Sequence, residues 1–150
     1  MSQSLSSVFL HVIFSTKKRA PIISPNFEKK LYAYIAGICR NLGSKAYRIG
    51  GTENHIHIAC TLPRTVSISQ FIATIKGRSS SWLRDKTPWS YKFEWQAGYA
   101  VFSVGQSNLR ALTSYIAKQR EHHKSQSFKN ELLLFCRRYG VKYNKDYIWD

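Results

Sequence analysis

The chain has 150 residues, of which 43% are hydrophobic, so it can build the core of one domain over residues 1–150 and is not a disordered tail. Its 23 lysine and arginine residues outnumber 8 acidic residues, and the net charge of +15 favours a polyanionic partner through phosphate neutralisation. No apolar stretch approaches the roughly 20 residues of a membrane-spanning helix, and we expect no secretory signal and no membrane partner.

The first half of the chain alternates strand and helix patterns. β-branched and aromatic residues over 7–16 predict a buried strand, and a basic loop with two prolines follows it. Apolar residues recur at helical spacing from Asn26 to Leu42 and predict a helix. Residues 44–51 predict a second strand, which closes on two glycines, and residues 54–62 predict a third.

The second half continues with helix, strand and two further helices. Ser67, with a glutamine three residues later, has the pattern of a capping box and begins a predicted helix. Residues 94–104 predict a fourth strand. Ser107 or Asn108 caps a third long helix with an apolar stripe, and a fourth helix covers about 128–139. We expect the aromatic tail that follows to pack back on the body.

The predicted order is therefore β-α-β-β-α-β followed by two helices. The first six elements match the ferredoxin-like split arrangement, an α+β fold with an antiparallel sheet. Its two crossover helices cover one face of the sheet. The other face is free for a ligand, a partner or the two additional C-terminal helices.

Three widely spaced cysteines, Cys39, Cys60 and Cys136, include no Cys-x-x-Cys pair. This spacing argues against a disulfide framework and against a cysteine-rich zinc site. We expect buried thiols in a reducing compartment, as in a cytoplasmic protein.

His55 and His57 flank a single isoleucine in the third predicted strand. Side chains alternate along a strand, so both imidazoles leave the same face, about 6.5 Å apart along the backbone. From there they can converge on one metal ion. By itself the pair also fits two strand histidines with backbone partners.

Tyr115 and Gln119 lie four residues apart in the third predicted helix, and therefore on one face of it. A tyrosine can serve as a nucleophile, and an amide oxygen is a suitable ligand for a divalent cation. His122 falls near the same face. The alternative for Tyr115 is a purely structural place in the apolar stripe of this helix.

Several kinds of catalytic site have no signature in this chain. The eight acidic residues, Glu131 among them, form no spaced pair that resembles the carboxylate clamp of two-metal nucleases. A serine-hydrolase elbow and a phosphate-binding loop are missing, so we expect no nucleotide cofactor. Phosphodiester chemistry here would use one metal held by histidine and glutamine, with a tyrosine nucleophile.

A strand with two histidines around one hydrophobic residue, followed by a tyrosine helix, resembles the signature of the HUH endonucleases. Nearly the whole chain is similar to the single-tyrosine transposases of the insertion-sequence-200/605 type, in stretches such as "HVIFSTKKRAPII", "FEWQAGYAVFSVG" and "YIAKQREHHKSQSF". Members of this family act on DNA inside bacterial or archaeal cells.

The resemblance implies both the site and the reaction. It assigns the nucleophile to Tyr115 and the ligands of Mg²⁺ or Mn²⁺ to His55, His57 and Gln119. The substrate is single-stranded DNA with hairpin ends, which is cut and rejoined through a 5′-phosphotyrosine intermediate. The family works as homodimers in which the tyrosine helix can complete the partner's site, and both a shared and a separate site stay open here.

Basic residues supply candidate DNA contacts, with aromatic side chains as stacking platforms for unpaired bases. The stacking candidates are Tyr91, Phe93, Trp95 and Tyr99. The basic candidates are Lys17, Lys18, Arg19, Lys76, Arg78 and Arg84.

Two other classes of protein share part of these features. A non-catalytic module that binds single-stranded DNA or RNA has the same element order in RRM domains, although "AGYAVFSV" lacks the leading basic residue and the aromatics of that motif. A zinc hydrolase would use His55 and His57 with His122 or His123, and Glu53 as its general base.

Overall fold

The computed structural model of the protein describes residues 2–86 and 92–150, and four antiparallel strands form its single sheet, in the order β2-β3-β1-β4. This topology confirms the predicted ferredoxin-like α+β fold. The strands are β1 Phe9–Ser15, β2 Ala46–Gly51, β3 His55–Thr61 and β4 Ala100–Val104.

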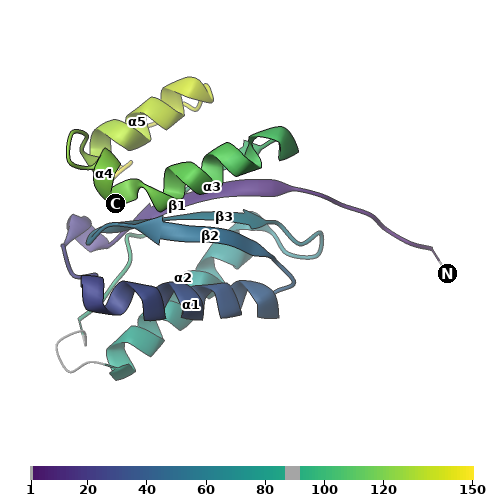
Figure 1. The fold of residues 1–150 in the computed structure, drawn as a ribbon, viewed down its shortest axis with the longest axis horizontal. Coiled ribbons are helices and arrows are strands. Elements are labelled where there is room, and N and C mark those ends of the chain that lie inside the picture. The colour runs from purple at the N-terminus through teal and green to yellow at the C-terminus, as the bar shows by residue number, and fades with distance from the viewer. Residues whose placement is uncertain (1, 87–91) are drawn as a thin grey trace.

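Helices cover both faces of this sheet (Figure 1). On one face lie the crossover helices α1 (Pro25–Asn41) and α2 (Ile68–Lys86). On the other lie α3 (Leu109–Ala117), α4 (Gln119–His122) and α5 (Phe128–Arg138). The sheet face that the sequence left free is thus taken by the C-terminal helices of the chain itself. No helix of the described residues combines the length and the apolar character that a membrane crossing requires.

Local signals in the sequence explain where the first two long helices begin. The Ser24 side chain accepts a hydrogen bond from the amide of Asn26, and Ser67 Oγ accepts one from the amide of Gln70, so each caps a helix N-terminus. After α1 the chain turns at Gly43, whose φ of +85° suits glycine. These ends lie close to the predicted ones.

Two hydrophobic clusters lie on opposite sides of the sheet. The larger one packs between the sheet, α1 and α2, and includes Phe14, Ile35, Ile58 and Phe71. The smaller one lies under α5 and consists of Ile13, Phe102, Phe128, Leu132, Phe135 and Cys136. The tail packs back as predicted, since Ile148 and Trp149 contact this smaller cluster. All three cysteines are free and buried.

Two predicted elements differ from the structure. The fourth strand begins at Ala100 and not at residue 94, because Trp95 makes only an isolated bridge with Thr16 before the chain leaves the sheet. The third helix is interrupted at Lys118, whose φ of −104° and ψ of 22° are not helical. Gln119 therefore begins the short helix α4 and does not continue α3.

The register of the strands sets which side chains face α3–α5. Ile13 of β1 lies opposite His57, and Ser15 opposite His55. Ile56 and Ile58 point instead into the larger cluster, as period-two alternation requires. His11 of β1 lies on the histidine side, diagonally across from His57.

Candidate functional site

His55 and His57 are fully buried beneath the C-terminal helices. The pair therefore lies in an enclosed space between sheet and helices, and not on an open sheet face as the sequence suggested. Gln119 reaches it despite the break at Lys118, with 3.0 Å between Gln119 Oε1 and His55 Nε2. The structure thus brings together the three residues that were predicted as metal ligands.

Glu131 of α5 lies at the centre of this group, and sequence reasoning missed it. Its Oε1 is 2.9 Å from His57 Nε2 and 3.1 Å from His123 Nε2. Its Oε2 accepts hydrogen bonds from Gln119 Nε2, at 3.0 Å, and from the Tyr115 hydroxyl. Glu131 is only 1% exposed, so one buried carboxylate connects the candidate nucleophile to the candidate ligands.

A signal for Glu131 was present in the pattern of α5. The helix begins at its cap Ser127, whose side chain accepts from the amide of Asn130, and its buried stripe includes Phe128, Leu132 and Phe135. Glu131 falls within that stripe, where an amphipathic helix has an apolar residue. A carboxylate buried in this way requires polar partners.

The two adjacent histidines after α4 have different surroundings. His123 Nε2 is 3.1 Å from both Gln119 Oε1 and Glu131 Oε1. His122 instead stacks on the Tyr115 ring, with ring centroids 4.5 Å apart, and its Nε2 has no hydrogen-bond partner among the described residues. We call the converging residues the polar cluster, and its members are His55, His57, Gln119, His123 and Glu131.

The outer nitrogens of the strand histidines are held by other side chains. His55 Nδ1 is 2.7 Å from Asn54 Oδ1 and 3.0 Å from Thr52 Oγ1. His57 Nδ1 is 2.8 Å from Nε2 of His11. Such partners fix the ring orientation of metal-binding histidines, and here they turn both Nε2 atoms into the polar cluster.

Burial governs the protonation of the polar cluster. Burial, with the neighbouring His57, lowers the pKa of His55 to about 3, so its imidazole is neutral near pH 7. Burial alone would raise the pKa of Glu131, but hydrogen bonds from His123 and His57 outweigh it and hold that pKa below its usual range. Neutral imidazole and ionised carboxylate are the forms that bind cations.

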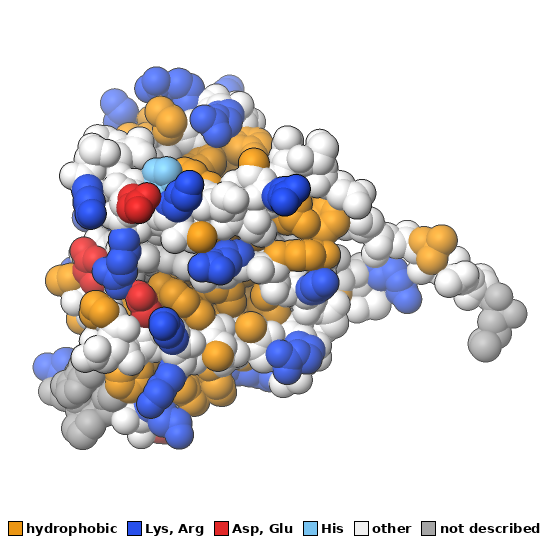
Figure 2. Space-filling model, in the orientation of Figure 1, with side chains coloured by type: hydrophobic (Ala, Val, Ile, Leu, Met, Phe, Trp, Pro, Cys, Tyr) orange, Lys and Arg blue, Asp and Glu red, His pale blue; other side chains and the backbone are white. Residues whose placement is uncertain are grey.

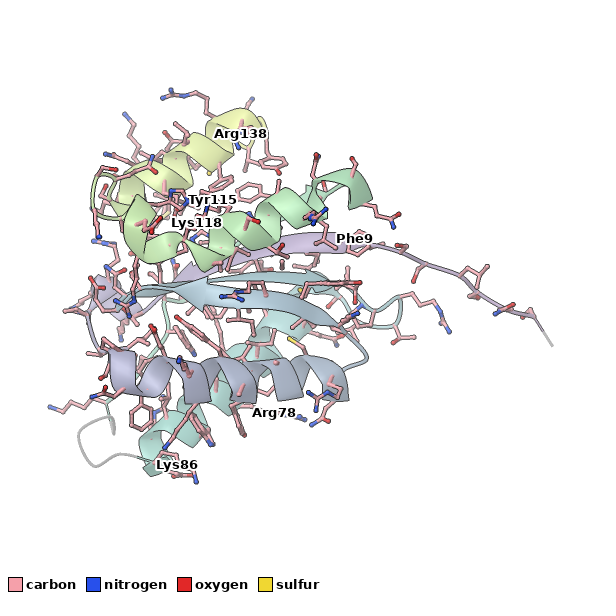
Figure 3. The ribbon with its side chains drawn as sticks, viewed as in Figure 1. Phe9, Arg78, Lys86, Tyr115, Lys118 and Arg138 are labelled. Carbon is pink, nitrogen blue, oxygen red and sulfur yellow. The ribbon has the colours of Figure 1, made fainter. Side chains whose placement is uncertain are left out.

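Tyr115 is half-buried between α3 and α5 (Figure 3). Burial, then the hydrogen bond to Glu131, raises the pKa of Tyr115 above its usual range. The phenol therefore carries its proton at neutral pH. Its reactivity as a nucleophile then depends on a positioned phosphate and on positive charge beside it.

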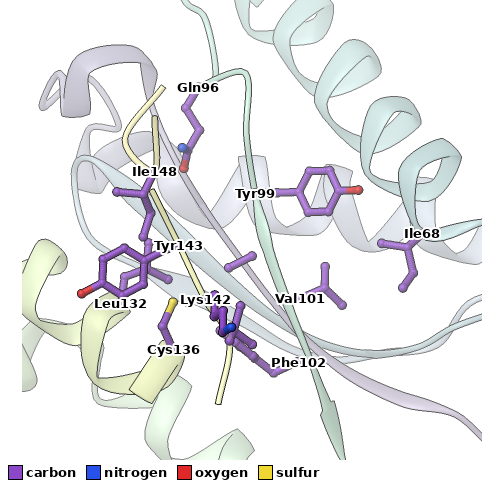
Figure 4. Close-up of a pocket in the computed structure, with 12 residues that line it drawn as sticks. Ile68, Gln96, Tyr99, Val101, Phe102, Leu132, Cys136, Lys142, Tyr143 and Ile148 are labelled. Atoms are coloured by element: carbon purple, nitrogen blue, oxygen red, sulfur yellow. The ribbon is translucent and has the colours of Figure 1, made fainter. Parts of the chain in front are cut away.

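Two cavities border this region. One of about 440 Å³ lies between α3 and α5 and is lined by Tyr115, His11 and Arg138 among others. Another of about 360 Å³ borders Gln119 and is lined by the basic residues Lys118 and Arg120. A third, of about 490 Å³, follows β4 and the C-terminal tail (Figure 4) and contains no residue of the polar cluster.

Three predicted DNA-binding residues lie far from Tyr115. Lys76, Arg78 and Arg84 belong to α2, on the opposite face of the sheet (Figure 3). Lys76 is engaged within the fold, because its ammonium donates to the carbonyl oxygens of Gln96, at 2.7 Å, and Gly98, at 2.5 Å. These bonds give Lys76 a structural role in the fold, and its role as a phosphate contact stays a prediction.

Arg78 and Arg84 remain exposed. Arg84 Nε also donates to the carbonyl oxygen of Phe93, at 3.1 Å. Figure 2 shows lysine and arginine side chains spread over the visible face, beside both helical layers. The positive charge is therefore not confined to the side of Tyr115.

The basic run at residues 17–19 forms a short 3₁₀ helix directly after β1. Lys17 is paired with Glu94 at 2.8 Å, and Lys18 is exposed. The Arg19 guanidinium lies 5.6 Å from the centroid of the Trp149 ring, and the Lys129 ammonium lies 5.1 Å from it. This run therefore lies near α5, which carries Glu131.

Two of the four predicted stacking platforms are part of the core. Phe93 and Trp95 are 2% and 8% exposed and pack edge-on against one another, so the prediction that they stack on unpaired bases was wrong. Tyr99 is 41% exposed. Tyr91 lies outside the described residues.

Both the sequence and the fold are similar to those of known proteins. A family model described as "Transposase IS200 like" matches residues 4–119. The transposase for insertion sequence element IS200 of Salmonella typhimurium is 25% identical over 119 residues, which span 76% of this chain and 78% of that protein. The transposase of the same name from Salmonella typhi matches equally.

Two solved structures have the same fold. A putative transposase from Deinococcus radiodurans is 19% identical, with a TM-score of 0.61 over 79% of this chain and 98% of the other. A REP-associated tyrosine transposase bound to a REP hairpin is 16% identical, with a TM-score of 0.60 over 82% of this chain and 74% of the other.

Proposed function

The chain belongs to the family of IS200-like transposases, and from this premise we propose that it cuts and rejoins single-stranded DNA with Tyr115 as the nucleophile. The observation that carries the proposal is the shared carboxylate of Glu131, which contacts the Tyr115 hydroxyl, His57 and Gln119. A nucleophile and a set of metal-binding donors thus meet in one buried group.

His55, His57 and Gln119 are the proposed ligands of Mg²⁺ or Mn²⁺. Their donor atoms suit a divalent cation, since neutral imidazole nitrogen and amide oxygen converge beside a carboxylate. When bound, the ion supplies positive charge that polarises a phosphate oxygen and stabilises the transition state.

The residues of the chain account for the other parts of the reaction. Glu131 holds the Tyr115 hydroxyl in place. Attack of that oxygen on phosphorus forms a 5′-phosphotyrosine bond and breaks the bond to the 3′ oxygen. The phenol loses one proton and the 3′ oxygen gains one, so the exchange is balanced. Because one phosphoester replaces another, rejoining needs no nucleotide cofactor.

The proposed partner is single-stranded DNA with a hairpin, as in the solved relative that is bound to a REP hairpin. Lys118 and Arg120 border the cavity next to Gln119, and the 17–19 run lies near α5. We assign phosphate contacts to these groups. A homodimer remains part of the proposal. The contact between Tyr115 and Glu131 within one chain supports a separate site in each subunit.

The structure favours this reaction over the two alternatives. RRM domains stack bases on an open sheet face, whereas here α3–α5 cover that face (Figure 1). The zinc hydrolase relied on Glu53, which is exposed, and the carboxylate at the histidines is Glu131.

Replacing Tyr115 with phenylalanine tests the proposal, because it removes only the hydroxyl. The purified protein with Mn²⁺ and hairpin-bearing single-stranded DNA from the flanks of the gene should form a covalent adduct that survives denaturing electrophoresis. Tyr115→Phe should bind the same DNA without forming the adduct. Tyr147→Phe, a change of an exposed tyrosine outside the polar cluster, is the matched control and should behave as wild type. An adduct formed by Tyr115→Phe would contradict the assignment.

A further inference from the structure

We infer that Glu131 and His123 bind the same ion as the three proposed ligands, and that Glu131 also fixes Tyr115 beside that ion through its second oxygen. This inference rests on the proposed function for the identity of the nucleophile. Its metal-binding part stands on the geometry of the polar cluster alone.

The spacing of the donor atoms fits one coordination sphere. Ligands at about 2.1 Å from a metal lie about 3.0 Å apart at right angles and about 3.4 Å apart in a tetrahedron. Glu131 Oε1 lies 2.9 Å from His57 Nε2, 3.1 Å from His123 Nε2 and 3.6 Å from His55 Nε2. One ligand atom from each of these four residues lies within 4.8 Å of the others.

The amide of Gln119 completes the set. Its nitrogen donates to Glu131 Oε2 at 3.0 Å, which turns its oxygen toward the histidines. That oxygen lies 3.0 Å from His55 Nε2 and 3.1 Å from His123 Nε2. Five donor atoms from three segments, namely β3, residues 119–123 and α5, therefore converge on one position.

The hydrogen bonds around His55 show why this position suits a cation. His55 Nδ1 donates to Asn54 Oδ1 at 2.7 Å, so the neutral ring has its lone pair on Nε2. That lone pair faces Gln119 Oε1 at 3.0 Å and Glu131 Oε1 at 3.6 Å. His55 Nε2 and Gln119 Oε1 are then two acceptors that face each other and repel, and a shared cation removes this repulsion.

The donor set also selects among metals. Three imidazole nitrogens with an amide and a carboxylate oxygen favour Mn²⁺ and later transition metals, whereas Mg²⁺ prefers oxygen ligands and keeps several waters. We therefore expect Mn²⁺ to bind more tightly than Mg²⁺.

Glu131 has a second contact that His123 lacks. Its Oε2 accepts from the Tyr115 hydroxyl, and the Tyr115 ring lies edge-on to His57, with ring centroids 6.0 Å apart. Glu131 therefore acts on both the ion and the nucleophile, while His123 acts on the ion. Because of this difference, metal binding and the positioning of Tyr115 can be tested with separate variants.

Calorimetric titration of the metal-free protein with MnCl₂ tests the metal-binding part. Glu131→Gln and His123→Gln should each weaken Mn²⁺ binding at least about tenfold. The matched controls are Glu121→Gln, an exposed glutamate of α4, and His122→Gln, the neighbour outside the polar cluster. Both should stay within about twofold of wild type. Far-UV circular dichroism shows whether each variant is folded, and unchanged Mn²⁺ affinity in folded Glu131→Gln and His123→Gln would overturn the inference.

Adduct formation with DNA at saturating Mn²⁺ tests the positioning part. His123→Gln should recover the wild-type rate, because only its metal affinity is impaired, while Glu131→Gln should stay at least about tenfold slower. Equal recovery of both variants would refute the role of Glu131 in positioning Tyr115. If the proposed function is wrong, the result is different: the wild type binds Mn²⁺ through these residues but forms no adduct with DNA.

Discussion

Several residues of the polar cluster occupy buried positions that hydrophobic side chains usually fill. His57 lies within a strand that is buried at every residue except Thr61, and Glu131 lies in the apolar stripe of α5. Each has a partner, since His57 contacts both His11 and Glu131. A polar group that is buried without a partner lowers the stability of the fold. Removing one of these residues should therefore destabilise the fold, because its partners stay buried without their hydrogen bonds.

Replacing His55 with alanine should abolish adduct formation, because it removes one proposed ligand and leaves Gln119 Oε1 facing a void. The free energy of unfolding should fall by about 1–3 kcal/mol, through the loss of the bonds to Asn54 and Thr52. Urea denaturation and the adduct assay measure the two effects. A folded His55→Ala that still forms the adduct would exclude this residue as a required ligand.

The sequence predicted the parts of the site that follow from local periodicity. Alternation along β3 predicted that His55 and His57 share a face, and helical spacing predicted that Gln119 lies near Tyr115. Glu131 is 16 residues from Tyr115 on another helix, and the packing of α5 on α3 depends on contacts that periodicity does not encode. The predicted topology already placed the helix of Arg78 and Arg84 on the other face of the sheet, but the charges of these residues do not show which face contacts DNA.

At the level of elements, the position of α3 on the sheet depends on its close approach to β2. A Cβ atom built on Gly50 would lie 2.7 Å from the carbonyl oxygen of Ile116 and 2.9 Å from its Cγ2. Only glycine permits this approach. Ile116 is buried next to Tyr115, so the glycines at the end of β2 help to set the position of Tyr115, the proposed nucleophile.

Gly50→Ala should therefore lower the free energy of unfolding by about 1–3 kcal/mol, through overpacking, and should slow adduct formation. Gly37→Ala is the matched control, since a Cβ there meets no atom within 4 Å. In the interior of α1 it should stabilise the protein by about 0.5–1 kcal/mol. Thermal unfolding and the adduct assay on both variants test the contrast, and two variants with equal stability would contradict it.

At the level of the whole molecule, the net charge of +15 predicts a large electrostatic contribution to the proposed binding of DNA. Positive residues occur on both helical layers, with Lys118 on the side of Tyr115 and Arg78 on the other (Figure 3). The overall charge therefore predicts binding without showing where the strand lies. The salt dependence of DNA binding, measured for variants of single basic residues on each side of the sheet, shows which side contacts the strand.

The logarithm of the affinity for single-stranded oligonucleotides should fall linearly with the logarithm of salt concentration, with a slope of about −0.7 for each neutralised phosphate. Lys118→Ala should reduce the steepness by about 0.7. Lys76→Met should leave the slope unchanged and lower the melting temperature, because its ammonium binds backbone carbonyls. Fluorescence anisotropy at several salt concentrations measures the slopes. A less steep slope for Lys76→Met would show that Lys76 contacts a phosphate.

The two hydrophobic clusters differ in size, and the smaller one lies beneath the helical layer that covers the histidines. His55 and His57 are completely shielded from solvent, so direct contact between these two side chains and any substrate would require the layer of α3–α5 to move away from the sheet. The cluster under α5 contains far fewer buried residues than the one under α1 and α2, so local opening of this layer costs less free energy than global unfolding.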